Sequence, residues 1–381
     1  MQLNALLRRA VERGASDVHL KLRQPPVFRV DGVLEPLRDA EPLTEANLET
    51  ALHTVVGSAS TRLERFREQG ELDMAYSTDE LPRFRVNCFR QRGSISLAFR
   101  YIPETVPSFD ELGLPHGVAR LAQEERGLLL VTGASGVGKT TTLAAMIDEI
   151  NRTRRQHIVT VEDPIEFLHH DRSCIVNQRE VGIDTVSFHT ALRSVLRQDP
   201  DVILIGELRD AETAETALQA AETGHLVLST MHTIDAAETI ARMIEFFPAA
   251  KQSQVRSVLA STLRGVISQR LLPRADGGRV PAVEVMVMNA RIDELIREER
   301  TNELQAAIEE GSFLHMQSFQ QALINLVLSD AVEPEIAANS SSNKHDFLVE
   351  LDHALKRRKA EEEGWVDPLS ANANARVGIV R

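Results

Sequence analysis

Apolar residues repeat with two different spacings along the first hundred residues of the chain. Leu3, Leu6 and Leu7 share one helical face, whereas apolar and polar residues alternate on both sides of Arg92 and Gly93. The first spacing predicts an amphipathic helix, and the second predicts a β-hairpin that turns at the Arg-Gly pair. Together they predict a small α+β module, with helices near 2–13 and 44–69, strands near 16–22 and 26–32, and the hairpin over 83–102.

A different pattern starts near residue 120, where short apolar runs alternate with helical segments. Such runs are typical of strands that are buried on both faces of a parallel sheet. After residue 235 the pattern is mainly helical through 330, and AANSSSNK then interrupts the chain before a charged helix. The last residues, 370–381, are predicted to be disordered. The buried strands are predicted near 127–132, 157–161, 202–206 and 226–230.

Three prolines, at positions 103, 107 and 115, lie between the two patterns. Prolines among turn residues are typical of a linker. We therefore expect four parts: an N-terminal module over 1–102, a linker over 103–116, an α/β domain with a helical C-terminal subregion over 117–335, and a charged helical or disordered tail over 336–381.

Composition narrows the classes of function. The chain has 381 residues, with 43 Lys and Arg against 56 Asp and Glu, and its formal net charge is -13. This charge disfavours long-range attraction to nucleic acid or anionic lipid, although it allows local basic patches. The two cysteines form no CxxC pair, and no apolar stretch approaches the roughly 20 residues that cross a bilayer. We expect a cytoplasmic protein that neither inserts directly into a membrane nor acts on nucleic acid.

The segment GASGVGKT, residues 133–140, has the strongest chemical signal in the chain. It matches G-x-x-x-x-G-K-[ST] between an apolar strand and a helix-compatible segment, which is the context of a phosphate-binding loop. Its glycines let backbone N–H groups surround phosphates, Lys139 is expected to reach the β- and γ-phosphates, and the Thr140 hydroxyl is expected to hold Mg²⁺. We predict binding of ATP and Mg²⁺ by Gly133, Ser135, Gly136, Val137, Gly138, Lys139, Thr140 and Thr141.

Acidic residues follow two of the predicted strands. Glu162, Asp163 and Glu166 stand in IVTVEDPIEF, and Glu207 stands in DPDVILIGELRDAET. Ligands bind at the carboxyl ends of parallel strands, where a carboxylate can polarise the water that attacks the γ-phosphate. Among the first three we favour Glu166 as the base, and we expect Glu207 to contact Mg²⁺ through water. A solvated acidic turn and an ordinary strand-end acid are the alternative interpretations.

Two histidines bracket the last predicted strand, in GHLVLSTMHT. His225 and His232 are seven residues apart, an odd spacing that places their side chains on opposite faces of a strand and disfavours a shared metal ion. His232 and Thr233 follow the carboxyl end of the strand, where they are candidates to sense the γ-phosphate. For His225 we expect a structural or inter-subunit role.

Arginines complete the candidate chemistry, because phosphoryl transfer needs cations beyond Mg²⁺ and the loop lysine. One group lies four residues apart on a predicted helix and another lies in the N-terminal hairpin. For each arginine alone, a surface salt bridge is the simpler interpretation. The candidates are Arg193, Arg197, Arg83, Arg85, Arg92 and Arg100.

These motifs together resemble the secretion-type ATPases of type II secretion and type IV pili, most closely the PilT-like retraction branch that drives twitching motility. The resemblance covers roughly residues 1–330 and rests on GASDVHL, RFRVN, VTGASGVGKTTTLAAM (Walker A), VEDPIEF (Asp box), DPDVILIGELRD (a Walker B that ends Gly-Glu in this family) and TGHLVLSTMHT (His box).

The resemblance implies a PAS-like N-terminal domain, a flexible linker and a RecA-like ATPase domain, assembled as a homo-hexamer. ATP would bind between the two domains, with Arg85 and Arg100 closing onto the nucleotide, and Glu162, Glu166, Glu207 and His232 serving catalysis. The ring would act at the inner face of the cytoplasmic membrane, through an inner-membrane pilus platform protein and with a paralogous pilus ATPase as a further candidate partner.

Two departures from the family pattern leave alternatives open. The segment expected as AIRNLIRE is ARIDELIRE here, with Ile292, Asp293 and Glu294 at the changed part, and GMQT is HMQS at His315 to Ser318. An accessory PilU-like retraction role, another secretion-type ATPase or a divergent motor therefore stay open. A nucleic-acid translocase and a non-hydrolysing adaptor in a mixed ring are the alternatives from other classes.

Overall fold

The protein, seen here in a computed structural model, is described over residues 2–30, 32–57, 60–103 and 105–362. Its chain forms two compact units. The first comprises residues 1–106 together with the loop Pro164–His170, and the second comprises Pro107–Asp163 and Asp171–Arg381. The segment predicted to be disordered, 370–381, lies outside the described residues.

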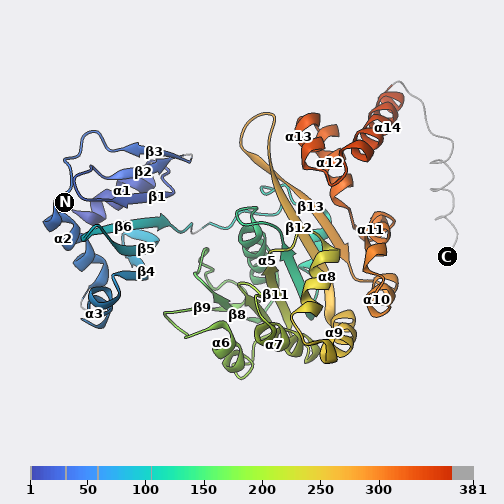
Figure 1. Ribbon diagram of the computed structural model, residues 1–381, viewed down its shortest axis with the longest axis horizontal. Coiled ribbons are helices and arrows are strands. Elements are labelled where there is room, and N and C mark those ends of the chain that lie inside the picture. The colour runs from blue at the N-terminus through green and yellow to red at the C-terminus, as the bar shows by residue number, and fades with distance from the viewer. Residues whose placement is uncertain (1, 31, 58–59, 104, 363–381) are drawn as a thin grey trace. The chain divides into compact units, whose positions relative to one another are not determined.

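The first unit is built on a six-stranded antiparallel sheet in the order β3-β2-β1-β6-β5-β4 (Figure 1). Three helices and the inner face of this sheet enclose a core of aliphatic and phenylalanine side chains. The elements are α1 (Leu3–Glu12), β1 (Asp17–Leu20), β2 (Val27–Val30), β3 (Val33–Pro36), α2 (Glu45–Val56), α3 (Ser60–Gln69), β4 (Glu71–Thr78), β5 (Leu81–Gln91) and β6 (Ser94–Tyr101).

The predicted hairpin is confirmed as β5 and β6, with Gln91 paired to Ser94 across a two-residue turn. Arg92 and Gly93 both have positive φ, 51° and 83°, as tight hairpin turns require. The helix predicted over 44–69 is two helices, because Gly57, at φ 63°, ends α2. The N-terminal helix is confirmed as α1, whose leucines are buried.

The second unit has a seven-stranded sheet in the order β13-β12-β7-β11-β10-β8-β9, parallel except for β13. Figure 1 shows helices on both sides of it. The strands are β7 (Gly127–Thr132), β8 (His157–Glu162), β9 (Ile175–Glu180), β10 (Val202–Ile205), β11 (Leu226–Met231), β12 (Leu263–Pro273) and β13 (Arg279–Val287). The helices up to β12 are α4 (His116–Leu121), α5 (Lys139–Thr153), α6 (Phe188–Val195), α7 (Ala211–Glu222), α8 (Ala236–Glu245) and α9 (Ala249–Thr262).

All four strands predicted for this sheet are present, as β7, β8, β10 and β11. The fold class is confirmed: an antiparallel N-terminal module precedes a mostly parallel α/β domain with a helical C-terminal part. The prediction of mainly helical structure after residue 235 is wrong for 263–287, where β12 and β13 pair. Polar residues interrupt the apolar run in these strands, and Ser268, Gln269 and Glu284 each form a hydrogen bond with a partner elsewhere in the domain.

The C-terminal part packs as small helices against the β12–β13 hairpin. Their shared core includes Phe319, Leu323 and Phe347, all buried. The predicted charged helix is confirmed as the long α14. The elements here are α10 (Ala290–Arg297), η1 (Thr301–Glu303), α11 (Leu304–Glu309), η2 (Ser312–Leu314), α12 (Phe319–Leu328), α13 (Pro334–Ser340) and α14 (Lys344–Glu362).

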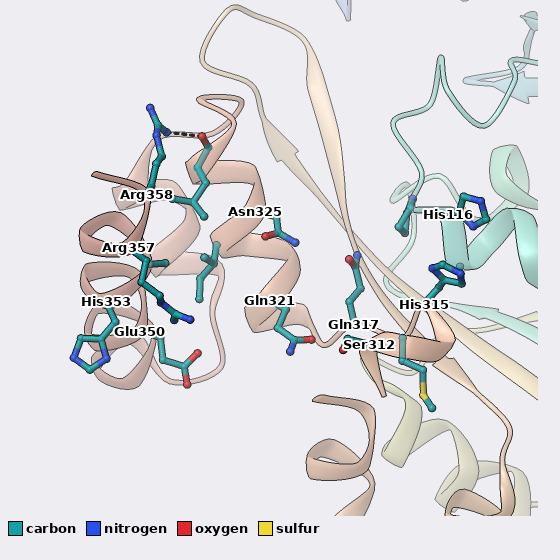
Figure 2. A pocket seen from close by; sticks show the side chains of 16 residues that line it. His116, Ser312, His315, Gln317, Gln321, Asn325, Glu350, His353, Arg357 and Arg358 are labelled. Carbon is teal, nitrogen blue, oxygen red and sulfur yellow. Dashed lines mark hydrogen bonds between the residues drawn. The ribbon is translucent and has the colours of Figure 1, made fainter. Parts of the chain in front are cut away.

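A pocket of about 860 Å³ lies between α12, α14 and the start of α4. Figure 2 shows Gln321 and Asn325 of α12 on one side of it and Glu350 and Arg357 of α14 on another. The rings of His116 and His315 lie 4.7 Å apart at its far end. None of its lining residues comes from the phosphate-binding loop or the acidic segments, so the candidate chemistry of this domain lies elsewhere.

Candidate active site

The phosphate-binding loop joins the buried strand β7 to α5. Gly133, Gly136 and Gly138 have φ values of 137°, 80° and 92°, a region that glycine adopts without steric cost. Gly138 caps α5 in the left-handed conformation, so the loop curls over the N-terminus of a helix of 15 residues. Backbone N–H groups at such an end, with the helix dipole, attract anions.

Gly133 is also required because another strand lies against it. A Cβ built at Gly133 would overlap the carbonyl oxygen of Gln269 and approach Val137 to 2.9 Å. Gln269 is on β12, and its Nε2 donates to Thr142 Oγ1 of α5 at 2.9 Å. Next to it, Ser268 accepts from Thr132 Oγ1 at 3.0 Å. These two residues of β12 support the loop, and the sequence analysis missed them because it assigned no strand there.

Lys139, the first residue of α5, is buried and folds back over the loop. Its Nζ donates to the carbonyl oxygens of Gly133 at 2.7 Å and Ala134 at 2.9 Å. Ser135 and Gly136 are exposed at the tip, and Thr140 and Thr141 are half-buried. The tip of the loop is therefore exposed, and the ammonium group of Lys139 is held by the carbonyl oxygens of the loop.

Four strand ends meet beside this loop, because β7, β11, β10 and β8 are consecutive parallel neighbours. Met231 pairs with Thr132, which places His232 next to the start of the loop. Further along, Thr230 Oγ1 donates to the Gly206 carbonyl at 2.7 Å and fixes the chain just before Glu207. The segments containing Lys139, Glu162, Glu207 and His232 thus lie along one edge of the sheet.

Glu207 is the acid at the centre of this edge, with a side chain only 13% exposed. It pairs with Arg209 Nε, and its Oε2 lies 3.5 Å from His232 Nε2. His232 is about half exposed and lines a cavity of about 430 Å³ with Arg209, Thr233 and Arg242. The structure thereby brings together Glu207 and His232, which the sequence placed 25 residues apart.

The two other candidate carboxylates have opposite surroundings. Glu162, at the end of β8, is buried and accepts from Thr160 Oγ1 at 2.6 Å and from Gln178 Nε2 at 3.1 Å. Glu166 is exposed, in the loop Pro164–His170 that groups with the first unit. Glu162 is therefore held by its neighbours on the sheet, whereas Glu166 is open to solvent.

The candidate arginines of the first unit lie side by side, because Arg85 of β5 pairs with Arg100 of β6. Arg100 Nε donates to Asp17 Oδ1 at 3.0 Å, and Arg85 Nε lies 3.8 Å from Asp73 Oδ1. Both side chains remain well exposed, at 65% for Arg100 and 40% for Arg85. The pair forms an accessible cationic patch on one face of the N-terminal sheet.

The remaining histidine candidate, His225, has a structural environment. It stands at the opposite end of β11 from His232, and its Nδ1 lies 2.9 Å from the Ala220 carbonyl oxygen. This contact ties the end of α7 to the start of the strand. The odd spacing of the two histidines thus separates them by the length of β11.

The groups at this edge fit a nucleotide with a divalent cation. The loop has open space and no side chain at Gly136 to obstruct a phosphate, and Thr140 follows at the start of the helix. A hydroxyl and a carboxylate are the oxygen ligands that Mg²⁺ takes, usually with several waters. Thr140 and Glu207 supply that pair of groups on the same edge, following strands β7 and β10, which β11 separates.

Comparisons with known proteins agree with this geometry. The family described as Type II/IV secretion system protein matches residues 1–277. The Type IV pilus retractation ATPase PilT of Pseudomonas aeruginosa is 43% identical over 91% of this chain and 100% of its own length. The Type IV pilus ATPase PilU of the same organism is 39% identical over 92% of each chain. A crystal structure of the pilus retraction motor PilT with bound ADP matches with a TM-score of 0.85 and 43% identity, over 91% of this chain and 98% of that one.

Proposed function

Since the chain belongs to the type II/IV secretion system family, whose pilus ATPases it matches over nearly its whole length, we propose that it is an ATP-hydrolysing motor that drives retraction of type IV pili. The observation that carries the proposal is the contact between Glu207 and His232 at the sheet edge that also holds the phosphate-binding loop. A carboxylate and an imidazole beside a loop lysine are groups that can handle charge during phosphoryl transfer.

The loop residues are proposed to hold the phosphates. Backbone N–H groups from Gly133 to Thr141 surround them, and Lys139 exchanges its loop carbonyls for the β- and γ-phosphate oxygens. Thr140 would hold Mg²⁺ directly and Glu207 through water, and the ion would neutralise charge on the β- and γ-phosphates. We propose that His232, which lies 3.5 Å from Glu207, reports the presence of the γ-phosphate to the following helix α8.

For the general base we propose Glu166. Glu162 is buried and its Oε1 already accepts hydrogen bonds from Thr160 and Gln178, so this oxygen is engaged within the sheet. Glu166 is exposed and has the freedom to approach a water molecule when the site closes. Glu162 is then a support for the strand end, and its loss would act on the position of the loop.

Closure onto the nucleotide is assigned to Arg85 and Arg100, the exposed pair on the N-terminal sheet. We propose that residues 103–116 act as the hinge and that six copies form a ring, which transmits opening and closing to an inner-membrane platform protein. The ring would act in the cytoplasm at the inner face of that membrane. No helix within the described residues has the length and apolar character needed to span a bilayer.

The test is steady-state phosphate release and mass of the purified full-length protein with ATP and Mg²⁺. We compare wild type with Lys139→Ala, Glu207→Gln and Glu166→Gln, and use Glu222→Gln, an exposed acid at the end of α7, as the control. Lys139→Ala is expected to abolish turnover, and Glu166→Gln is expected to lower kcat about 100-fold with ATP affinity retained. Unchanged hydrolysis by Lys139→Ala would refute the site.

An accessory role in retraction is the second candidate, because the similarity to PilU is nearly as extensive as that to PilT. Turnover by the purified protein alone excludes a non-hydrolysing adaptor. Restoration of twitching in cells that lack their retraction ATPases separates the principal motor from the accessory one. DNA-stimulated, salt-sensitive ATPase activity would instead support a translocase.

A further inference from the structure

A buried carboxylate lies behind the His232 loop and has no part in the proposed chemistry. Glu284, in the middle of β13 and opposite Ser268 of β12, is 1% exposed. Its Oε1 accepts a hydrogen bond from the Ala236 backbone N–H at 2.9 Å, and the backbone amide of Phe319 acts on the same carboxyl group by lowering its pKa. Ala236 begins α8 and Phe319 begins α12, so the backbone amides that act on this one side chain come from the N-termini of two helices.

On the first side, the carboxylate fixes the helix that follows His232. Only three residues separate His232 from Ala236, and this short loop is tied to α8 by its own hydrogen bonds. Thr233 Oγ1 lies 2.6 Å from Thr239 Oγ1, and Asp235 Oδ1 accepts from the Glu238 amide at 2.8 Å. A shift of His232 is thereby transmitted to the first turn of α8.

On the second side, an arginine connects the same place to the C-terminal helices. Arg270 of β12 stands diagonally from Glu284 on the same face of the hairpin. Its guanidinium lies 4.1 Å from the centre of the Phe319 ring, and Nη1 donates to the Ser340 carbonyl oxygen at 2.6 Å. Through Arg270, the β12–β13 strand pair that carries Glu284 thus contacts the start of α12 and the end of α13.

We propose that Glu284 is a positioning residue that couples the His232 loop to the C-terminal helices α12 and α13. The inference rests on the ATPase activity proposed above. When nucleotide occupancy moves His232 and α8, the shared carboxylate makes α12 move with it. Such a link gives the C-terminal helices a response to the nucleotide, although none of their residues lies at the phosphate-binding loop.

The link depends on the charge of the carboxylate. The amides at the two helix N-termini stabilise the ionised carboxylate. A protonated carboxyl group carries a proton on one oxygen, and that O–H group is a donor facing other donors. The pKa of Glu284 is raised to about 7, mainly by burial. Asp235 also raises this pKa, while the Ala236 amide, Arg270 and the Phe319 amide lower it. Asp235 on α8 and Arg270 on β12 are the charged groups that act on it. The coupled state is therefore favoured as the pH rises through neutrality.

The test measures kcat and KM for ATP of the full-length protein from pH 5.5 to 8.5, in wild type, Glu284→Gln and Arg270→Met. Wild-type kcat is expected to rise with a midpoint near 7. Glu284→Gln, which keeps shape and one acceptor, should lose this step and lower kcat about tenfold at pH 8 with KM within about twofold. Arg270→Met should move the step to higher pH, because Arg270 lowers the pKa of Glu284. A step that persists in Glu284→Gln overturns the proposal.

A second measurement needs no turnover. Hydrogen exchange of the first turn of α12 is compared with and without ADP or a non-hydrolysable ATP analogue. Nucleotide is expected to change its protection in wild type but not in Glu284→Gln, and equal changes in both would also overturn the proposal. Absence of hydrolysis in wild type would instead contradict the ATPase assignment, so the two failures are distinguishable.

Discussion

Replacing Glu284 by Gln should change how the stability of the protein depends on pH. Burial of this carboxyl group on β13 raises its pKa from 4.5 to about 7 in the folded protein. At about 1.4 kcal/mol for each pKa unit, ionisation costs the folded state about 3 kcal/mol. Because the pKa is higher in the folded protein than in the unfolded chain, stability falls as the pH rises. The contribution of the neutral acid to stability is fully present below pH 4.5 and is lost as the pH rises through 7.

The Gln variant cannot ionise at this position, so its free energy of unfolding does not fall between pH 4.5 and pH 7 as that of wild type does. Relative to wild type, it should gain about 3 kcal/mol between pH 4.5 and pH 8 while being the less active enzyme at pH 8. Urea unfolding followed by circular dichroism, at one fixed protein concentration because assembly affects the midpoint, measures the difference. For Glu222→Gln, at an exposed site, the free energy of unfolding should depend on pH in the same way as that of wild type. Parallel curves for Glu284→Gln and wild type would refute the reasoning.

Three further substitutions test the site and its supports. Gly133→Ala introduces a Cβ against Gln269 at φ 137° and should destabilise the domain by about 3 kcal/mol or more. The control Gly277→Ala, at φ 98° in open space, should destabilise it by about 1 kcal/mol. Thermal unfolding measures the stability of both variants. His232→Ala should lower kcat about tenfold while fluorescent ADP still binds normally, and lost ADP binding would count against its role at the γ-phosphate. Asp210→Ala removes the cap that accepts from the Thr213 amide at 2.8 Å and should destabilise by about 1 kcal/mol, seen as a lower urea midpoint with unchanged KM.

The features that sequence predicts well are those determined locally. GASGVGKT specifies a strand, a turn and a helix within a short stretch, and the apolar runs of β7 and β11 are too short and too buried to be surface helices. From parallel strands alone it follows that Glu207 and His232 reach the same edge, and their 3.5 Å separation agrees.

The features that sequence misses depend on partners far along the chain. In β12, Ser268 and Gln269 have the polarity of surface residues. They are buried in the domain because they form hydrogen bonds with Thr132 and Thr142, which lie more than 120 residues earlier in the chain. Glu284 likewise interrupts an apolar strand, and the backbone amides that act on it come from the starts of two helices. The alternation in LRGVISQRLLP was the available signal, but Gly265 and these polar residues weakened it.

The lysine folded beneath its own loop bears on which ligands the protein can accept. Lys139 is already satisfied by the carbonyl oxygens of Gly133 and Ala134, so an incoming molecule must replace those bonds with at least equal ones. Adenosine brings no anion, and the single phosphate of AMP falls short of the ammonium, which reaches the second and third phosphates. We therefore predict that a diphosphate or triphosphate displaces these carbonyl oxygens from Lys139, whereas adenosine and AMP do not, before any contact with the base is made.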